Sequence, residues 1–234
     1  MAWIEHEHAS PVALAEALAG VLHHACSKAI EVRGQVRLAL AGGSTPLPAY
    51  GALAAMPLDW DRTFIMPTDE RCVPHDHAAS NVGALRAAFA RSPSERIAPL
   101  TVPDGDCPRS ESYARALMER ESARFDVVLL GMGNDAHTAS LFPGAPQLDA
   151  AMDAGSGLDA CRIDPDPLPA EAPFARITLT AARLLRARNL HLVITGEGKH
   201  AVLRQSQASR DMLRHPIAAL LHAPDTIVHV HWSP

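Results

Sequence analysis

Short apolar segments alternate with longer segments of helical periodicity along the whole chain. The most apolar of the short segments, residues 125–130, is a nearly unbroken run of strand length, which is typical of a parallel strand buried on both faces. Strands are expected at residues 36–41, 62–67, 97–102, 125–130, 158–163, 176–180, 190–195 and 226–231, with the last three closing the sheet. Helices are expected at residues 11–31, 46–55, 81–90, 108–124, 181–186, 199–206 and 217–221. This alternation predicts an α/β fold with a mostly parallel sheet and helices on both of its faces.

The pattern predicts a single domain over residues 1–234. The chain has no internal repeat and no long linker, and its 234 residues are enough to bury a substantial core. Residues 144–173 are rich in Asp, Pro, Gly and Ala, so we expect an irregular excursion there, with little regular structure beyond the strand at 158–163.

Composition and charge narrow the class of protein. The 21 Lys and Arg residues are outnumbered by 26 Asp and Glu residues, and the net charge of −5 provides no basic surface for nucleic acid. No segment reaches the roughly 18 uninterrupted apolar residues of a membrane helix, and the acidic amino terminus is unlike a signal peptide. We therefore expect a cytoplasmic protein that binds neither nucleic acid nor membrane, as a monomer or a homodimer.

The cysteines and histidines raise the question of disulfides and metal sites. The four cysteines are scattered and include no Cys-x-x-Cys pair, which favours reduced thiols over a disulfide framework or a zinc cluster. They are Cys26, Cys72, Cys107 and Cys161. Three histidine pairs are spaced two residues apart: His6/His8, His75/His77 and His229/His231. Such pairs share a strand face, but no helical ligand motif accompanies them, so solvated or strand-face histidines are favoured over a structural metal.

The apolar segment 125–130 runs directly into a glycine loop that presents an acid and a histidine. Gly131 and Gly133 allow a sharp turn and a close approach to a ligand, and Asp135 and His137 follow. Thr138 and its neighbours are expected to open a short helix whose free N–H groups face the same space. Open α/β sheets bind ligands at the carboxyl ends of their strands, so a functional role for His137 is favoured over a capping or core role.

A second glycine loop follows the first expected strand. It consists of Gly42, Gly43, Ser44 and Thr45, and Pro46 then opens the next expected helix. Unpaired N–H groups, two hydroxyls and the positive end of a helix dipole suit a phosphate, although the same residues also make an ordinary strand-to-helix turn. The spacing matches neither a Walker loop nor Gly-x-Gly-x-x-Gly, so it indicates no nucleoside triphosphate and no dinucleotide.

Residues 125–143 resemble the signature of 6-phosphogluconolactonases, whose usual form is Gly-x-Gly-x-Asp-Gly-His-Thr-Ala-Ser-Leu-Phe-Pro. Further segments are similar to other blocks of this family, in the same order and spacing: residues 38–46, 68–74 with 80–81, 176–180 and 196–199. The resemblance extends over almost the whole chain. It implies a Rossmann-like fold of the type shared by sugar-phosphate isomerases and these lactonases.

One residue departs from the family pattern, because Ala136 stands where the family has glycine. Glycine is needed at such a position only if the backbone is left-handed. Every other block is intact, and a strained loop would be expected to misplace His137. We therefore expect an ordinary negative φ at Ala136.

The resemblance assigns a binding role to several charged and polar residues. Arg71 and Lys199, each after an expected strand, provide a planar fork and a mobile point charge for a phosphate dianion. Arg176 either adds to this positive charge or holds Asp69 in place. Asp69 and Asn81 are expected to orient sugar hydroxyls or the loop itself, with structural capping as the alternative.

The resemblance implies hydrolysis of 6-phospho-D-glucono-1,5-lactone to 6-phosphogluconate in the oxidative pentose phosphate pathway. A δ-lactone has an activated carbonyl, so a positioned base suffices: neutral His137 would accept a proton from water, and the imidazolium would protonate the leaving ring oxygen. Asp135 would orient the imidazole or stabilise its charged form, and N–H groups after Gly131 would stabilise the oxyanion. No cofactor and no metal are expected.

Other chemistries fit the sequence less well. Ser140 is a poor candidate for a nucleophile, because the chain has no Gly-x-Ser-x-Gly elbow. An amino-sugar-phosphate deaminase/isomerase of the same fold is disfavoured by the Thr-Ala-Ser-Leu-Phe-Pro segment after His137. A noncatalytic sugar-phosphate-binding module is the third alternative, although the sequence carries no DNA-binding appendage.

Overall fold

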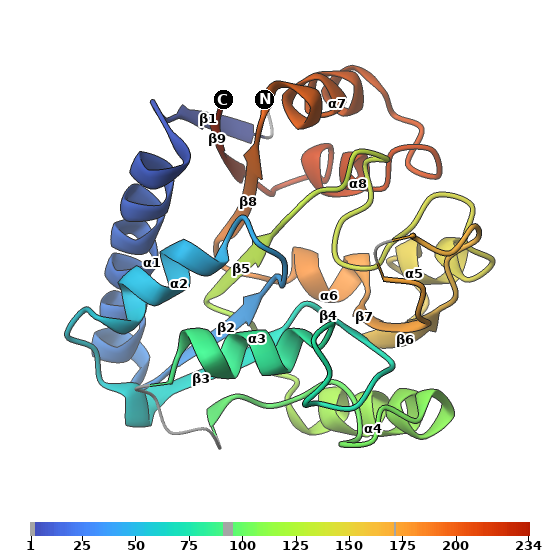
Figure 1. Ribbon diagram of the computed structural model, residues 1–234, viewed down its shortest axis with the longest axis horizontal. Helices are drawn as coiled ribbons and strands as arrows, with labels where there is room; N and C mark the ends of the chain where they lie inside the picture. Colours follow the sequence, from blue (N-terminus) through green and yellow to red (C-terminus); the bar gives the residue numbers. More distant parts are fainter. Residues whose placement is uncertain (1–2, 91–95, 171) are drawn as a thin grey trace.

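The fold is built around a six-stranded parallel sheet (Figure 1). The computed structural model describes residues 3–90, 96–170 and 172–234, so residues 1–2, 91–95 and 171 of the expected domain lie outside the described part. In spatial order the sheet contains β1 (Trp3–Glu7), β9 (Val228–Ser233), β8 (Leu190–Thr195), β5 (Val127–Leu130), β2 (Val36–Leu40) and β3 (Thr63–Pro67). Every neighbouring pair is parallel, which confirms the predicted α/β class.

Helices and a second sheet enclose the central sheet. One face packs against α1 (Pro11–Arg33), α2 (Leu47–Ala54) and α3 (Asn81–Ala88). The other face packs against α4 (Cys107–Arg120), α5 (Leu148–Met152), α6 (Ala181–Leu185), α7 (Glu197–Ala208) and α8 (Ile217–Leu221). A short 3₁₀ helix, η1 (Trp60–Arg62), precedes β3. Among the described helices, none is long and apolar enough to cross a membrane.

The central strand β5 explains the unbroken apolar run in its sequence. Val127 and Leu129 pack in the core on the side of α1 to α3, whereas Val128 and Leu130 pack in the core on the opposite side. All four side chains are fully buried. Because both faces of the strand are covered, no polar alternation is possible.

A second sheet holds the strands β4 (Asp69–Arg71), β7 (Arg176–Leu179) and β6 (Ala160–Ile163), which pair antiparallel. The expectation that the strand at 176–180 closes the main sheet is therefore wrong. Thr68 is the branch point, because its N–H donates to Leu40 in the main sheet and its carbonyl accepts from Leu179 in the second sheet. The chain thus leaves the main sheet after β3, and β7 pairs with the diverted strand.

Other elements also differ from the expectation. β1 was not expected, and the strand expected at 97–102 is reduced to a single bridge between Ile97 and Ile65. The excursion at 144–173 contains α5 in addition to its strand. The helix expected at 108–124 ends at Arg120, where the buried Arg183 guanidinium donates hydrogen bonds to the carbonyls of Glu121 and Ala123. A tertiary contact therefore accompanies the early end of α4.

The order of strands defines where a ligand can bind. In the sheet, β3 lies on one side of β2 and β5 lies on the other. Strands that follow β2 in the chain are therefore added first on one side and then on the other, and the strand order reverses between β2 and β5. In open α/β sheets the crevice at such a reversal, beyond the carboxyl ends of the strands, is the usual binding site. The loops that follow β2 and β5 are the two glycine loops singled out in the sequence.

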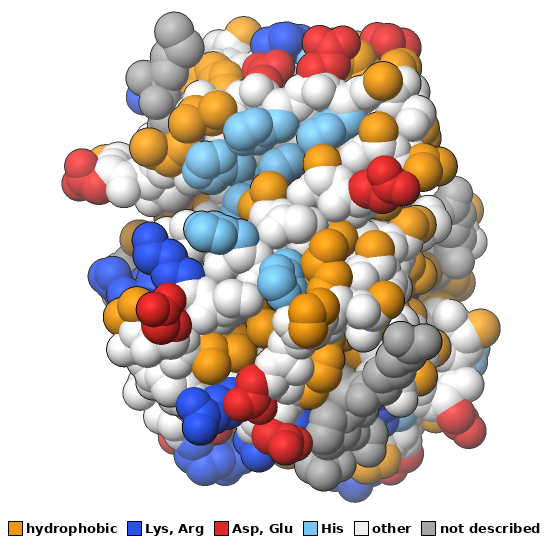
Figure 2. Space-filling model, turned by 90° about the vertical axis from the view of Figure 1, so that its left-hand side faces the viewer, with side chains coloured by type: hydrophobic (Ala, Val, Ile, Leu, Met, Phe, Trp, Pro, Cys, Tyr) orange, Lys and Arg blue, Asp and Glu red, His pale blue; other side chains and the backbone are white. Residues whose placement is uncertain are grey.

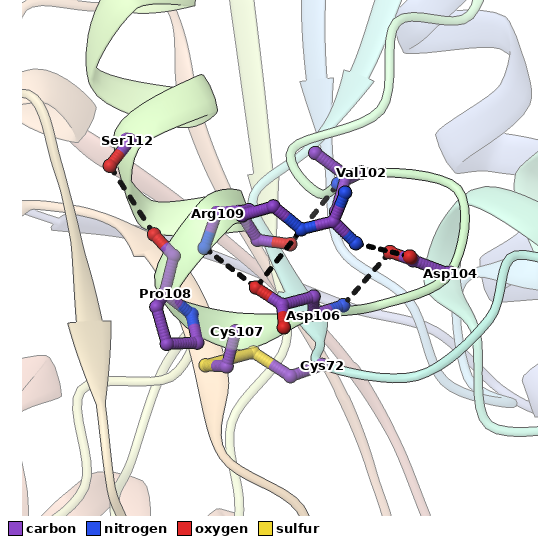
Figure 3. Close-up of polar contacts among 9 residues, drawn as sticks. Cys72, Val102, Asp104, Asp106, Cys107, Pro108, Arg109 and Ser112 are labelled. Carbon is purple, nitrogen blue, oxygen red and sulfur yellow. Dashed lines mark hydrogen bonds and ion pairs between the residues drawn. A yellow bond between two sulfur atoms is a disulfide. The ribbon is translucent and has the colours of Figure 1, made fainter.

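The expectation of four reduced thiols is wrong for two of the cysteines. Cys72, which follows β4, and Cys107, the first residue of α4, form a disulfide with their Cα atoms 5.2 Å apart (Figure 3). Cys26 and Cys161 are free and buried, as expected. The paired residues are 35 positions apart in the sequence, so no local spacing pattern reveals their proximity.

Histidine side chains gather in one patch on the face of the molecule seen in Figure 2. Five of them, which we call the histidine cluster, belong to β1, β9 and β8 or the residue after β1: His6, His8, His191, His229 and His231. Their rings stack, and two ring nitrogen contacts of 3.1 Å join His6 to His229 and His191 to His231. Within the described ranges, no three potential ligand side chains are arranged to hold a metal ion.

We expect the histidine cluster to make the fold sensitive to acid. Burial, followed by neighbouring histidines, lowers the pKa of His191 to about 4 and that of His231 to about 3. The unfolded chain, with ordinary histidine pKa values near 6.5, therefore binds more protons as the pH falls below about 6.5, so stability decreases toward pH 4. Urea denaturation at pH 5 should give a free energy of unfolding about 2–4 kcal/mol lower than at pH 7.

Single substitutions separate the effect of the histidine cluster on stability from the protonation of other groups. His191→Gln and His231→Gln should each reduce the difference between pH 7 and pH 5. His24→Gln changes an exposed histidine of α1 and should leave the difference unchanged. Equal stability of the unmodified protein at the two pH values would contradict the prediction.

Candidate active site

A cleft of about 470 Å³ opens at the carboxyl ends of β2 and β5. It brings together ten residues to which the sequence analysis assigned a binding or catalytic role: Gly42, Gly43, Ser44, Thr45, Asp69, Arg71, Asn81, His137, Arg176 and Lys199. Asp135 does not line the cleft, but its carboxylate contacts Nδ1 of His137. These residues come from segments far apart in the sequence, and the fold gathers them at the reversal point of the sheet.

The imidazole of His137 is held from three directions. Its Nδ1 lies 2.5 Å from Oδ1 of Asp135, and the same oxygen accepts the backbone N–H of His137 at 3.1 Å. The ring stacks on Phe142, with 4.1 Å between the ring centroids. A Cβ at Gly133 would lie 2.3 Å from the ring, so only glycine at that position leaves room for the observed rotamer.

The contact between Asp135 and His137 fixes the charge state of the carboxylate. Burial disfavours ionisation of Asp135, but the hydrogen bonds and charge of His137 outweigh burial and lower the pKa of Asp135. An ionised Asp135 accepts a hydrogen bond from Nδ1–H, and whenever the ring is neutral this tautomer leaves the lone pair on Nε2. Nε2 makes no hydrogen bond with the described residues, so it is free to act on a ligand in the cleft.

The expectation of a negative φ at Ala136 is wrong, because its φ is +64°. The Ala136 N–H donates to the Gly133 carbonyl at 3.1 Å, and the Gly133 N–H donates to the His137 carbonyl at 3.0 Å. These two bonds close a tight turn and require a left-handed residue at its corner. The Ala136 carbonyl also accepts the Ile217 N–H, which fixes the turn against α8. The site tolerates the strain because these neighbours over-determine the turn.

One further expectation for this loop is wrong. No helix begins at Thr138. Its hydroxyl donates to the Gly131 carbonyl at 2.8 Å, and its carbonyl accepts the Leu141 N–H. The next described helix is α5. The Gly133 N–H is occupied by the His137 carbonyl, so this one N–H group is not available to stabilise an oxyanion, and the role of the other N–H groups after Gly131 stays a prediction.

The carboxylate of Asp69 points into the cleft from a position that is only 6% exposed. The Ser140 hydroxyl donates to its Oδ2 at 2.5 Å, and the Thr68 hydroxyl donates to its Oδ1 at 3.2 Å. The Ser140 N–H in turn donates to the Thr178 hydroxyl. Ser140 therefore supports Asp69 and does not face the cleft as a nucleophile.

Asn81 makes a structural hydrogen bond and also borders the cleft, and its role in orienting a sugar hydroxyl stays a prediction. Its amide nitrogen donates to the Asp69 carbonyl at 2.7 Å, and its side chain also lines the cleft. A Cβ at Gly42 would lie 2.0 Å from Oδ1 of Asn81, so glycine at 42 allows the two segments to approach. Gly43 adopts a φ of +91°, which completes the turn of the loop.

Glu70 is a structural residue that the sequence analysis missed. It is fully buried, and its carboxylate accepts the backbone N–H groups of Arg71, Asn81 and Val82. Burial raises the pKa of Glu70, and these hydrogen bonds oppose the rise. The residue fastens β4 to the start of α3, which holds Arg71 and Asn81 in place. No local spacing connects Glu70 with a helix that begins eleven residues later, so only the resemblance, whose second block contains it, could have pointed to it.

Three cations line the cleft. The Arg71 guanidinium donates to the Ala79 carbonyl at 2.7 Å. Arg176 is 4% exposed and lies over the Phe142 ring at 5.2 Å, and burial lowers its pKa to about 10, so it stays protonated at neutral pH. Arg176 makes no ion pair with Asp69 in the described structure, which favours the first of its two expected roles. Lys199 lies in the first turn of α7, not in a loop, and forms no ion pair with any described residue.

A cationic cleft with a glycine loop and an acid–histidine pair, at the reversal point of a parallel sheet, defines an α/β enzyme that acts on a small anionic substrate. The chain belongs to the family of glucosamine-6-phosphate isomerases/6-phosphogluconolactonase, whose model matches residues 9–232. This membership confirms the resemblance found in the sequence.

Relatives within the family are similar in sequence to this chain over nearly its whole length. The 6-phosphogluconolactonase of Pseudomonas aeruginosa is 38% identical, covering 94% of this chain and 89% of the relative. That of Pseudomonas putida is 34% identical, covering 98% and 92%. The crystal structure of a 6-phosphogluconolactonase from Shewanella baltica OS155 matches with a TM-score of 0.90 and 32% identity, covering 99% of this chain and 97% of that one. The fold type implied by the resemblance is thereby confirmed.

We expect Ala136→Gly to stabilise the protein slightly. Relief of a left-handed alanine is worth about 1–2 kcal/mol, whereas the lost burial of one methyl group costs about 0.8 kcal/mol. Urea denaturation should therefore show a net gain of about 0.5 kcal/mol. The control is Ala145→Gly, which removes a buried methyl group from a residue without positive φ and should destabilise. A loss of stability in Ala136→Gly equal to that of the control would contradict the prediction.

Proposed function

We propose that this protein hydrolyses 6-phospho-D-glucono-1,5-lactone to 6-phosphogluconate, the lactonase step of the oxidative pentose phosphate pathway. The observation that carries the proposal is the His137 imidazole, whose Nδ1 is occupied by Asp135 and whose ring lines a cleft with three cations. The names of the relatives support the lactonase over the isomerase activity of the family.

His137 acts as the general base in the first step. Nε2 accepts a proton from a water molecule as the water oxygen attacks C1 of the lactone, and the carbonyl oxygen takes up negative charge. Asp135 stabilises the imidazolium that forms, because its carboxylate lies 2.5 Å from Nδ1. The stacked Phe142 ring keeps the imidazole plane fixed during the transfer.

The same histidine acts as the general acid in the second step. When the tetrahedral intermediate collapses, the bond between C1 and the ring oxygen breaks, and the imidazolium returns its proton to that oxygen. The products are a carboxylic acid at C1, which releases the second proton of the attacking water to solvent at neutral pH, and a hydroxyl at C5, and His137 is neutral again. No covalent intermediate is needed. This agrees with the hydrogen bond that the Ser140 hydroxyl donates to the Asp69 carboxylate, because a hydroxyl held in this way is not presented as a nucleophile.

The cations and the buried acid bind the two ends of the substrate. Arg71, Arg176 and Lys199 neutralise the phosphate dianion. Asp69 is a hydrogen-bond acceptor held by two hydroxyls, so it is suited to receive a sugar hydroxyl. This combination selects a phosphorylated polyhydroxy lactone over an apolar ester.

The direct test is a coupled assay in which glucose-6-phosphate dehydrogenase generates the lactone in place. The protein should accelerate its decay far above the spontaneous rate, and His137→Ala should lose about 100- to 10,000-fold of that acceleration. His24→Ala, an exposed histidine of α1, is the control and should retain full activity. No acceleration by the unmodified protein would refute the function, and more than about a tenth of wild-type turnover in His137→Ala would remove this residue from the mechanism.

The proposed phosphate contacts predict a substrate-dependent effect. Arg71→Ala and Lys199→Ala should each raise KM for the phosphorylated lactone by about 10- to 100-fold, because each loses a charge-assisted hydrogen bond. Hydrolysis of unphosphorylated gluconolactone should change by less than about threefold, since no phosphate contact is lost. Arg62→Ala and Lys28→Ala, which are exposed and outside the cleft, are the controls. Equal losses on both substrates would place Arg71 and Lys199 in another role.

A further inference from the structure

One of the two bonded cysteines is the chain neighbour of a cation that lines the cleft. Cys72 follows Arg71 in the chain, and its N–H donates to the Ala175 carbonyl next to Arg176. Cys107 begins α4, where Asp106 caps the helix and Arg109 pairs with Asp104 and Asp106 (Figure 3). The bond therefore connects the segment that carries Arg71 to a separate helix that contributes nothing to the lining of the cleft.

The two bonded cysteines differ from the other two in accessibility. Cys72 and Cys107 are half-buried, whereas Cys26 and Cys161 are buried in the core. Burial raises the pKa of Cys26 to about 12 and that of Cys161 to about 11, so these thiols stay protonated and unreactive near neutral pH. Of the four cysteines, Cys72 and Cys107 are therefore the two that are placed for thiol–disulfide exchange.

The segment beside the disulfide is held by contacts between loops. The His75 N–H donates to the Pro103 carbonyl, and the His75 ring contacts Thr101 at 3.1 Å. Gly105 packs so closely on Val73 that a Cβ would lie 2.2 Å from the Val73 carbonyl carbon. The residues between Cys72 and Ser80 form no helix or strand, so the disulfide is the one covalent restraint on this segment.

The same segment determines the position of the Arg71 side chain. The guanidinium donates to the carbonyl of Ala79, which lies near the far end of the segment from Cys72. Arg71 is thus tied to residue 79 through its side chain and to the disulfide through its neighbour in the chain. Motion of the segment therefore moves the partner that orients the guanidinium.

We propose that Cys72 and Cys107 are a reversible redox pair, oxidised by low-molecular-weight disulfides and reduced by thiols, that sets how firmly the Arg71 segment is held at the cleft. One cysteine thiolate attacks the external disulfide and releases one thiolate. The second cysteine then attacks the mixed disulfide and releases the other. Two cysteine thiols lose two electrons and two protons, which the external disulfide takes up to become two thiols.

The consequence for substrate follows from the proposed function, on which this part of the inference rests. In the oxidised form the segment is fixed, and Arg71 is pre-organised for the phosphate. In the reduced form the segment samples more conformations, so binding of the phosphate must order it at a cost in affinity. The chemical step depends on His137 and Asp135, which belong to a different loop, so it is unaffected.

The test equilibrates the full chain in glutathione buffers from fully reducing to fully oxidising. Peptide mass spectrometry should detect the Cys72–Cys107 cross-link only toward the oxidising end. Hydrogen exchange of residues 72–80 should be faster in the reduced form. KM for the phosphorylated lactone should rise about 3- to 10-fold on reduction, with kcat within about twofold, and the melting temperature should fall by about 5–10 °C.

Variants decide whether the pair is responsible. Cys72→Ser and Cys107→Ser should show the reduced-form KM and the reduced-form exchange in every buffer. Cys161→Ala, which changes a buried free thiol, should keep the full response to glutathione. A cross-link that never forms, one that thiols cannot reduce, or exchange and KM that are identical in both forms would each overturn the inference.

The exchange measurement keeps the two proposals separate. Absence of lactonase activity in every buffer, together with a redox-dependent cross-link and redox-dependent exchange of residues 72–80, would refute the proposed function and support the redox pair. Lactonase activity with the same KM at every glutathione ratio would refute the redox pair and support the function.

Discussion

The parallel pairing of β2 with β5 is the constraint on which the rest of the molecule depends. Leu40 pairs with Leu129 in this register, and both strands are buried on both faces. The pairing fixes the carboxyl ends of the two strands side by side, so their glycine loops open into one crevice. A one-residue shift would turn every side chain of β5 to the opposite face, and the two hydrophobic cores enforce the register against such a shift.

The loop that carries the acid–histidine pair contains a strained backbone residue, and the surrounding structure stabilises it. The turn from Gly133 to His137 requires left-handed backbone at Ala136, which is unfavourable for any residue with a Cβ. Hydrogen bonds within the turn and to Ile217 hold it in that conformation. Phe142 and Gly133 then leave the imidazole a single well-packed orientation. Rigid support of this kind is what a general base needs to act on a bound lactone.

The side of the cleft that carries Arg71, Asn81 and Arg176 is held mainly by polar interactions. Glu70 binds the first N–H groups of α3, and Thr68 links the two sheets. Arg176 is buried against Phe142. The segment after Arg71 contains no helix or strand and is joined to its surroundings by the disulfide and by contacts between loops, and the proposed redox pair acts on this part of the cleft.

The sequence by itself determined the α/β class, most helices and strands, and the two glycine loops of the cleft, because apolar periodicity and glycine loops are local properties of the chain. The charged residues of the cleft, such as Arg71 and Lys199, followed from the resemblance to the family. The sequence could not place β7 in a second sheet, pair Cys72 with Cys107, reveal Glu70 beneath α3, or show the left-handed backbone at Ala136. Each of these depends on contacts between segments distant in the sequence or on the closure of a specific turn. Only the packed tertiary structure brings those partners together, and so only it decided them.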